Sequence, residues 1–267
     1  MGEAIRRSIL IVTLSIANLL GLIGASSVLS AAEITLYSYY LPHRLTRTSD
    51  KQYDLLLKEL LADGDIRFSH QTAPLKRSSA SFRSNPVSCV WPANPRALKA
   101  VGREGTDDLI SSEPLDVVSL RLYTHEKPAG PVSIDDFEPE RIGYIRGSGA
   151  IPLLGEKSKR FIPLSSEEQL ISMLELGRLD AFLGHHPDTA LALDDLEKPG
   201  VLHVTPLAIL NLRFPVSFVC HDNKQTRSML MKLNPRIKVL AASGRLKEIL
   251  GEHAEFEDPQ DSAKQDF

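Results

Sequence analysis

A glycine–serine–glycine turn is the segment of this sequence best suited to bind a negatively charged group or a carbonyl oxygen. Gly147, Ser148 and Gly149 follow a short apolar run and precede a segment that we expect to begin a helix. Glycine lets the backbone approach a ligand closely, and amides at a helix start favour an anion. The turn, preceded by Arg146, is therefore a candidate ligand-binding loop, although an ordinary tight turn has the same pattern.

Three tyrosines end the first predicted strand. Strand alternation places Tyr37 and Tyr39 on one face and Tyr40 on the other. A tyrosine combines a flat apolar ring with a polar tip, which suits the wall of a ligand site. We expect one of the three to line a site and the others to lie in the core or on the surface.

Two arginines are candidates for contact with a charged ligand. Arg77 lies at the start of a predicted helix, and Arg96 follows Ala93-Asn94-Pro95. A guanidinium suits a carboxylate because it can donate two parallel hydrogen bonds. A solvated surface charge is the more common fate of an arginine, so this alternative stands beside the functional one.

The histidine pair at the end of an apolar run does not predict a metal site. His185 and His186 are neighbours in a predicted strand, so their side chains point to opposite faces. The sequence also contains no Ser-His-Asp signature, no paired-carboxylate motif and no cofactor fingerprint. We therefore predict no catalytic residue, no metal ligand and no cofactor.

A helix and a strand must position this histidine pair. Ser165 and Glu168 form a predicted capping box at the helix start, and Gly177 stops the helix. The apolar run 179–183 follows as a short buried strand. Asp180 is a charged residue within that run, so it needs a partner.

The chain before this segment begins with a predicted β–α–β unit, which points to a parallel sheet. Its strands lie at 33–40 and 66–69, and its helix is capped by Ser49 or Asp50 and stopped by Gly64. Further strands are predicted at 87–91, 117–123, 141–145, 161–164, 201–205 and 213–220, and helices at 74–82, 187–196, 226–233 and 237–250, with Pro235 separating the last two.

The N-terminus has the pattern of a secretory signal. Arg6 and Arg7 precede the apolar run 9–23, and small residues lead to Ala32. We predict a signal peptide at 1–32, cleaved after Ala32, with an uncleaved anchor as the alternative. The acidic, polar tail 257–267 is predicted to be disordered. A net charge of −3 argues against a dedicated nucleic-acid binder.

Two cysteines remain in a compartment that allows disulfides. Cys89 and Cys220 are 131 positions apart (220 − 89), which fits neither a CxxC redox motif nor a zinc site of usual spacing. A disulfide and two buried thiols both remain open.

The order of these segments resembles bacterial periplasmic solute-binding proteins, the two-lobed family that captures amino acids and related polar solutes for ABC importers. The resemblance covers essentially the whole chain after residue 32. It rests on the β–α–β unit, the turn Ser112-Glu113-Pro114, the Gly-Ser-Gly turn, and the run Gly177-Arg178-Leu179-Asp180-Ala181-Phe182. A final helix pair around Ser243-Gly244-Arg245-Leu246 completes it.

The resemblance implies an α/β fold of two lobes, each a mostly parallel sheet flanked by helices, joined by two hinge strands. It places Cys89 and Cys220 in one sheet. Tyr37, Tyr39 or Tyr40, Arg77 or Arg96, Ser112 and the turn Arg146–Gly149 would face the interlobe cleft. The implied segments are lobe 1 at 33–119 and 211–256 and lobe 2 at 120–210.

His185 stands where amino-acid binders of the family often have an aspartate for the ligand ammonium group. With the arginines, it would make the cleft richer in cationic and donor groups than in carboxylates. We therefore expect a monomeric periplasmic protein that binds an anionic or carboxylate-bearing small molecule for an ABC permease. The alternatives are a dehydratase-like enzyme on the same fold, in which Glu113 and His185 move protons, and a ligand sensor unrelated to transport.

Overall fold

The computed structural model describes residues 33–46, 48, 50–100, 108–130, 132–206 and 209–256, all within one compact unit that starts at Glu33. The predicted signal peptide at 1–32 and the predicted tail at 257–267 lie outside the described residues. Within the described ranges, no helix combines the length and the apolar character that a membrane crossing requires.

The predicted β–α–β unit is present, but its second strand begins later than expected. The strand predicted at 66–69 is wrong, because Ile66 packs into the core and the strand starts at Ser69. This strand lies at the edge of the sheet, where polar side chains are tolerated and the apolar signal is weak. The helix follows Lys51 without a side-chain cap, so the predicted cap at Asp50 is also wrong; Ser49 lies outside the described residues. The unit consists of β1 (Thr35–Tyr39), α2 (Gln52–Leu60) and β2 (Ser69–Ala73).

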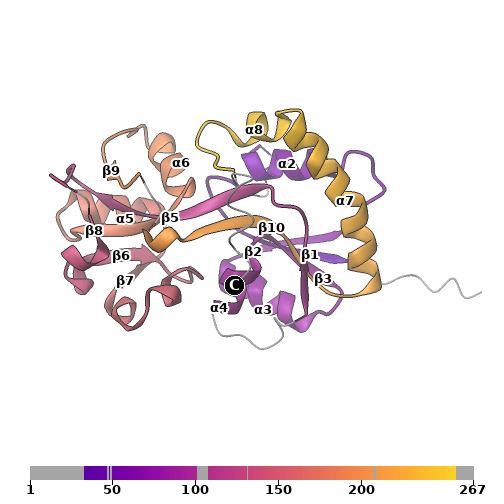
Figure 1. Cartoon of the computed structure of the whole chain (residues 1–267), viewed down its shortest axis with the longest axis horizontal. Helices are drawn as coiled ribbons and strands as arrows, with labels where there is room; N and C mark the ends of the chain where they lie inside the picture. Colours follow the sequence, from indigo (N-terminus) through magenta and orange to yellow (C-terminus); the bar gives the residue numbers. More distant parts are fainter. Residues whose placement is uncertain are drawn as a thin grey trace, which may run out of the picture. The chain divides into compact units, whose positions relative to one another are not determined.

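We call lobe 1 the group of elements built around β1. Its strands follow the order β2-β1-β3-β10, with β1 parallel to β2 and β3, and β10 antiparallel to β3. Helices α2, α7 and α8 lie together in Figure 1, and their buried leucines share one core with β1 and β10. The remaining elements are α3 (Leu75–Ser84), β3 (Ser88–Ala93), α4 (Pro95–Ala100), β4 (Leu109–Ser111), β10 (Arg213–His221), α7 (Lys224–Ala242) and α8 (Arg245–Leu250).

We call lobe 2 the group built around β6, which lies parallel to both β7 and β8. The helix expected after the Gly-Ser-Gly turn is wrong: a short 3-10 helix follows instead. Gly155, whose φ is 77°, ends this helix after one turn. The elements are β6 (Ile142–Ile145), the 3-10 helices Ile151–Leu154 and Glu156–Arg160, β7 (Ile162–Leu164), α5 (Glu167–Glu175), β8 (Ala181–His186), α6 (Asp188–Asp195) and β9 (His203–Val204).

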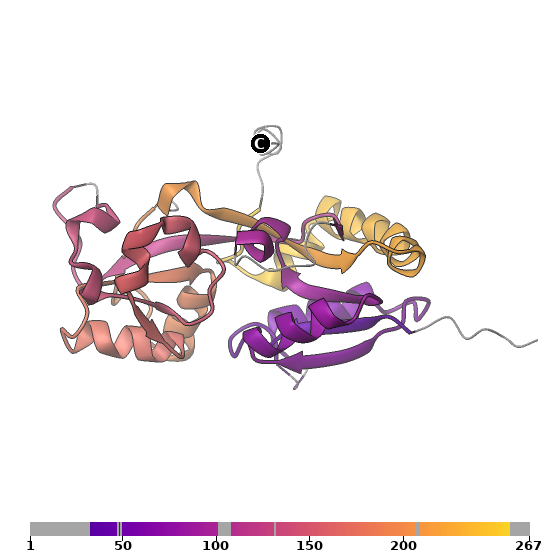
Figure 2. The same ribbon diagram turned by 90° about the horizontal axis from the view of Figure 1, so that it is seen from below.

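Two antiparallel strands connect the lobes. Figure 1 and Figure 2 show, from two directions, β5 (Asp116–Thr124) and β10 running side by side between the two groups. Along β5 the side chains pass from the core of lobe 1 to that of lobe 2 between Val118 and Leu120. Along β10 they change core between Phe214 and Val216. The lobe boundaries at 119/120 and 210/211 stay a prediction.

Pro235 does not separate two helices, contrary to expectation. Helix α7 continues through it to Ala242, and the break falls at Gly244, whose φ is 78°. Leu233 and Ile237 are buried on either side of the proline. We attribute the continuity to this packing, which offsets a proline cost of about 3 kcal/mol in a helix interior.

The capping box predicted at Ser165 and Glu168 is wrong, because the N-cap of α5 lies one residue later, at Ser166, and it caps with its side chain alone. Ser166 Oγ accepts a hydrogen bond from the Gln169 amide, and Gln169 Oε1 accepts one from the Ser165 amide. Gln169 thus bonds to the amide before the N-cap and not to the Ser166 amide, as a capping box would require. The stop at Gly177 is confirmed by its φ of 64°.

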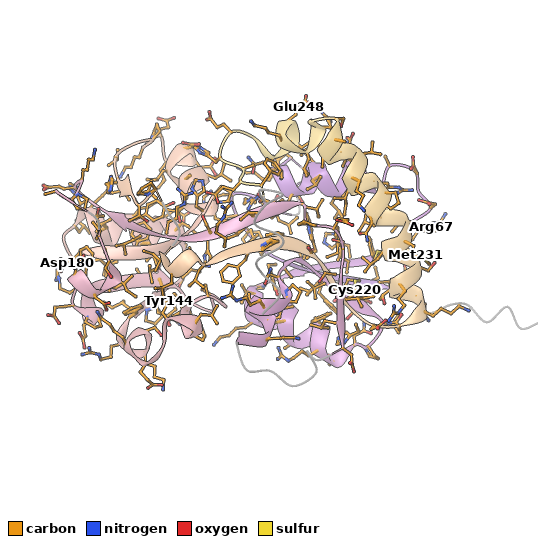
Figure 3. All side chains as sticks on the ribbon, in the orientation of Figure 1. Arg67, Tyr144, Asp180, Cys220, Met231 and Glu248 are labelled. Atoms are coloured by element: carbon orange, nitrogen blue, oxygen red, sulfur yellow. A yellow bond between two sulfur atoms is a disulfide. The ribbon has the colours of Figure 1, made fainter. Side chains whose placement is uncertain are left out.

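The two cysteines form a disulfide between residues that lie directly opposite each other on β3 and β10. The expectation that Cys89 and Cys220 share a sheet is confirmed, and the question of the bridge is answered. Figure 3 labels Cys220 in lobe 1 and Asp180 at the far end of lobe 2. The partner that Asp180 needs is Arg141, at 2.6 Å.

Candidate functional site

A cavity of about 170 Å³ lies between the two lobes. It opens beside the carboxyl ends of β1 and β3 in lobe 1 and of β6 and β8 in lobe 2, the edge at which open α/β sheets bind ligands. At roughly 30 Å³ per water, it has room for about five or six water molecules. Its lining is mainly apolar and includes Leu41, Leu98, Val118 and Phe214.

Three larger hollows of about 470–570 Å³ among the described residues each lie on a single lobe. One of about 570 Å³ lies on lobe 2 between Thr124 and Asp180, and the charged side chains in its lining are not buried. A buried charged side chain binds a polar ligand group more strongly than an exposed one does, because electrostatic interactions are stronger away from water. The interlobe cavity is therefore the candidate site.

Arg44 is the principal charged group of the cavity. Its side chain is fully buried and forms an ion pair with Asp116, the first residue of β5. The guanidinium carbon lies 3.8 Å from the centroid of the Tyr53 ring, and the Tyr53 hydroxyl donates a 2.8 Å hydrogen bond to Asp116. Asp188 of lobe 2 also lines the cavity, with a carboxylate oxygen 3.8 Å from Arg44 Nη1.

This arginine stays charged although it is buried. Burial alone would lower the pKa of Arg44, but the electrostatic effects of Tyr53, Asp116 and Asp188 raise it above its ordinary value. Nevertheless, Arg44 Nε and Nη1 are buried without any hydrogen-bond partner. Buried donors of a charged group are costly to leave unpaired. An oxygen atom of a ligand in the cavity can satisfy them.

The lobe 2 wall brings two of the predicted residues together. Ser148 Oγ lies 2.9 Å from His185 Nε2, and it also accepts a hydrogen bond from the Ala150 amide. Burial lowers the pKa of His185, which favours the neutral imidazole. Gly147 and Gly149 line the cavity with His185. A neutral histidine can donate or accept one hydrogen bond, but it adds no positive charge.

The three tyrosines have different environments. Tyr39 lines the cavity. Tyr37 packs in the same core cluster as Tyr39 but is not part of the cavity lining, and its hydroxyl accepts a hydrogen bond from Asn85. Tyr40 is 51% exposed. Of the group, Tyr39 alone is placed to contact a ligand in this cavity.

The predicted arginines do not reach the cavity. Arg77, Arg96 and Arg146 are exposed and are absent from its lining. Helix α3 buries Ser78 and Phe82, and its period turns Arg77 outward. The predicted excess of cationic groups in the cleft is therefore wrong, since the cavity is lined by one cation, Arg44, and by the carboxylate of Asp188.

Two further predicted residues are engaged elsewhere. Ser112 Oγ accepts a hydrogen bond from the Phe218 amide and donates one to the Glu113 carbonyl, within lobe 1. Glu113 forms a 3.0 Å ion pair with Lys238 of α7. The dehydratase-like alternative required Glu113 to meet His185, and this arrangement does not provide that pair.

Arg44 and Asp188 were missed by the sequence analysis. Both follow the carboxyl end of a sheet strand: Arg44 comes five residues after the end of β1, and Asp188 two residues after β8. Asp188 is also the first residue of α6, where the helix dipole favours an acidic side chain. Position after a strand, rather than a motif, is the signal that could have found them.

A second cluster of ionisable residues lies away from the cavity. Among the described residues, Asp194, Glu252 and His253 are the group whose possible metal-binding atoms all lie within 4.8 Å of one another. A 2.7 Å hydrogen bond from His253 to Asp194 accounts for their approach, and both carboxylates are exposed. We assign no metal to this cluster.

Comparisons with solved structures identify the fold of this chain, whereas comparisons of its sequence do not. No family model matches the sequence, and no curated protein matches it either. Among solved structures, the chain is similar to one describing glutathione import via GshT and the cystine ABC importer TcyBC of Streptococcus mutans. That match has 15% identity and a TM-score of 0.64, and it covers 86% of this chain and 99% of the other.

Two other structures are similar at comparable levels. The GluR0 ligand-binding core from Nostoc punctiforme, in complex with L-glutamate, has 13% identity and a TM-score of 0.61, with 81% of this chain and 96% of that chain covered. A histidine kinase sensor domain with similarity to periplasmic binding proteins has 10% identity and a TM-score of 0.61, covering 81% and 93%. The chain therefore has the two-lobed α/β fold of amino-acid-binding periplasmic proteins, and it is a divergent example of that fold.

Proposed function

We propose that this protein binds a small carboxylate-bearing solute between its lobes, with Arg44 as the carboxylate contact. The observation that carries the proposal is the pair of buried Arg44 nitrogens that lack hydrogen-bond partners at the wall of the cavity. A charge-assisted hydrogen bond to a carboxylate would satisfy them and would be strong in a site shielded from water.

The other residues of the cavity lining limit the class of solute further. Asp188 can accept a hydrogen bond from a donor group, and neutral His185 can complete the polar contacts of lobe 2. The apolar lining suits a short hydrocarbon part. A solute that carries both a carboxylate and a donor group fits this set better than a simple dianion. Glutamate and cystine, named for similar structures, have this chemistry.

We further propose that the protein is exported through residues 1–32 and delivers its solute, as a monomer, to an ABC permease. The similarity to a structure of the cystine importer system supports this role. The similarity to a histidine kinase sensor domain supports sensing as the second candidate. Solute uptake by cells with and without the gene separates the two, because a sensor changes gene expression without being needed for uptake.

A thermal-shift screen tests the binding proposal, since a ligand that binds only the folded state raises the melting temperature. The screen compares small carboxylates that carry an amine with their amides and with amines that lack a carboxylate. We expect stabilisation by members of the first set alone. Stabilisation by amides or by simple amines to the same extent would contradict the assignment of Arg44.

A further inference from the structure

Five exposed cations lie beside the interlobe cavity without belonging to its lining. Among the described residues, none of the five forms an ion pair with a carboxylate. The side chain of Arg146 donates a 3.3 Å hydrogen bond to the Pro163 carbonyl, but this neutral partner leaves its charge uncompensated. We call this group the cationic collar: Lys76 and Arg77 in the first turn of α3, Arg96 and Lys99 of α4, and Arg146, which directly precedes the Gly-Ser-Gly turn.

The three segments that carry the collar meet at one edge of the cavity. A Cβ atom on Gly147 would lie 3.3 Å from Leu75 Cδ2, and one on Gly149 would lie 3.0 Å from the Ala97 carbonyl oxygen. These four residues line the cavity and are themselves partly exposed. The edge of the cavity is therefore open to solvent here, and the sequence neighbours of its lining residues are members of the collar.

The segments around the collar contain no carboxylate. Residues 74–100 and 142–155 include neither Asp nor Glu, although acidic residues outnumber Lys and Arg in the whole chain, 34 to 31. A surface cation that is paired with a neighbouring carboxylate adds little to the potential farther away. The collar has no such pairs, so its five charges add up to a positive potential at the edge of the cavity.

The charges on the other side of the crossing strands are mixed. Figure 1 shows α2 and α6 on one side of β5 and β10, and α3 and α4 on the other. On the α2 side, Glu168 and Asp195 of lobe 2 are about half exposed and contact His43 of lobe 1. Lys51 compensates part of this negative charge, since it lies 3.3 Å from Asp195. An anion that approaches the cavity is therefore attracted to the collar side more than to the α2 side.

We propose that the cationic collar attracts solutes of net negative charge to the cavity and raises their rate of association, without contacting the bound solute. This role rests on the proposed function, since it requires a solute in the cavity. A cleft bordered by charge of one sign concentrates ions of the opposite sign and raises association rates by roughly 10- to 1000-fold. Among solutes that carry both a carboxylate and a donor group, the collar thus favours those with an excess of negative charge over neutral zwitterions.

Nuclear magnetic resonance with charged nitroxide radicals measures the potential at the collar without any solute. Two probes of similar size are used, the anionic carboxy-PROXYL and the cationic aminomethyl-PROXYL, and each accelerates the relaxation of the backbone amides near which it accumulates. We expect the amides of Gly147 and Gly149 to relax faster with the anionic probe than with the cationic one, and the amide of Asp195 to show no such preference. Equal effects of both probes on the two glycine amides would overturn the proposal.

Two variants of equal net charge separate the collar from the total charge of the protein. The collar variant combines Lys76→Gln, Arg77→Gln, Arg96→Gln, Lys99→Gln and Arg146→Gln. The control variant changes five exposed cations on other surfaces that also lack an ion pair, namely Lys58→Gln, Arg67→Gln, Arg178→Gln, Lys224→Gln and Lys247→Gln. The preference for the anionic probe should disappear in the collar variant and remain in the control. Its loss to the same extent in both variants would assign it to net charge and overturn the proposal.

Stopped-flow mixing with a carboxylate found in the thermal-shift screen tests the rate. At about 10 mM salt, where charges act over about 30 Å, we expect the association rate constant of the collar variant to be about tenfold lower than that of the control variant. The dissociation rate constant should change less than about twofold, because the collar does not contact the bound solute. At about 300 mM salt the difference in association should nearly vanish, because the charges are screened. A tenfold effect shared by five cations is about 1.6-fold for each, so one change such as Arg77→Ala leaves the affinity nearly normal.

Failure of the collar and failure of the proposed function give different results. A carboxylate that associates with the collar variant and the control variant at equal rates in low salt would overturn the collar and leave the cavity as the binding site. If the anionic probe accumulates at the turn but no screened carboxylate stabilises the protein, the positive potential is supported and solute binding is refuted.

Discussion

Arg44 and Asp116 form an ion pair in which neither side chain is exposed to solvent. Asp116 begins β5, one of the two strands that cross between the lobes, and Arg44 lines the cavity. The proposed ligand contact is thus held by the strand that must bend if the lobes move. A solute that engages Arg44 would act on the crossing strand directly, without any intervening residue.

Removal of the Asp116 charge should destabilise the fold strongly. In Asp116→Asn the buried guanidinium loses its counter-charge, and breaking a buried pair costs about 3–5 kcal/mol. Urea denaturation measures the change. The control is Asp180→Asn, which breaks the half-exposed pair with Arg141 and should cost only about 0–1 kcal/mol. Equal losses in both variants would contradict the importance assigned to burial.

Reduction of the disulfide should lower the free energy of unfolding. The bridge closes a loop of 131 residues, and the chain-entropy account gives up to about 5 kcal/mol for a loop of this length. The chain has two cysteines, so the effect of a reductant on its disulfides is confined to this bridge. We expect a lower urea midpoint once mass spectrometry confirms reduction. An unchanged midpoint would show that the bridge adds no stability.

A side chain at Gly149 should hold the lobes apart. A Cβ atom there would lie 3.0 Å from the Ala97 carbonyl oxygen of lobe 1, closer than such contacts normally are. Gly149→Ala should therefore increase the radius of gyration in solution, with unchanged circular dichroism. Gly130→Ala is the control, because a Cβ at Gly130 meets nothing within 4 Å. A radius that matches the unaltered protein would mean that the contact relaxes.

Glu167 should make stability fall as the pH rises from about 4.5 to about 7. Burial, reinforced by the charge of Asp188, raises its pKa in the folded protein from the ordinary 4.5 to about 7. The folded state therefore binds more protons than the unfolded state across this window, and the unfolding free energy decreases with pH. The full loss is on the order of 3 kcal/mol.

Replacement of the Glu167 carboxyl group should remove this dependence of stability on pH. We expect Glu167→Gln to gain stability relative to the unaltered protein at pH 8 and to gain none at pH 4. Urea denaturation at the two pH values gives the comparison, with the highly exposed Glu156 changed to Gln as the control. A gain of the same size at both pH values would exclude titration of Glu167 as its cause.

Local patterns predicted the elements and their order, because helices and buried strands carry periodic apolar residues. Gly177 and the apolar face of α2 are examples in which local chemistry agrees with the fold. The start of β2 was missed because an edge strand tolerates polar residues. The helix break predicted at Pro235 was wrong, because the packing of α7 within lobe 1 outweighs the local preference of proline.

The site was less predictable, because its principal residue depends on distant partners. Arg44 is buried because it packs against the Tyr53 ring and pairs with Asp116, which is 72 positions away. No spacing in the sequence distinguishes it from Arg77, which has better local context but faces solvent. His185 and Ser148, which lie 2.9 Å apart, could be predicted as site candidates because each belongs to a recognisable turn or strand end.

Titration calorimetry on Arg44 tests the central claim most directly. A carboxylate found in the thermal-shift screen is titrated into the unaltered protein, Arg44→Gln and Arg77→Ala. Loss of a charge-assisted contact should weaken binding in Arg44→Gln by roughly ten- to a hundredfold, whereas Arg77→Ala should bind normally. Unchanged affinity in a folded Arg44→Gln, or a comparable loss in Arg77→Ala, would contradict the assignment of the interlobe cavity as the binding site.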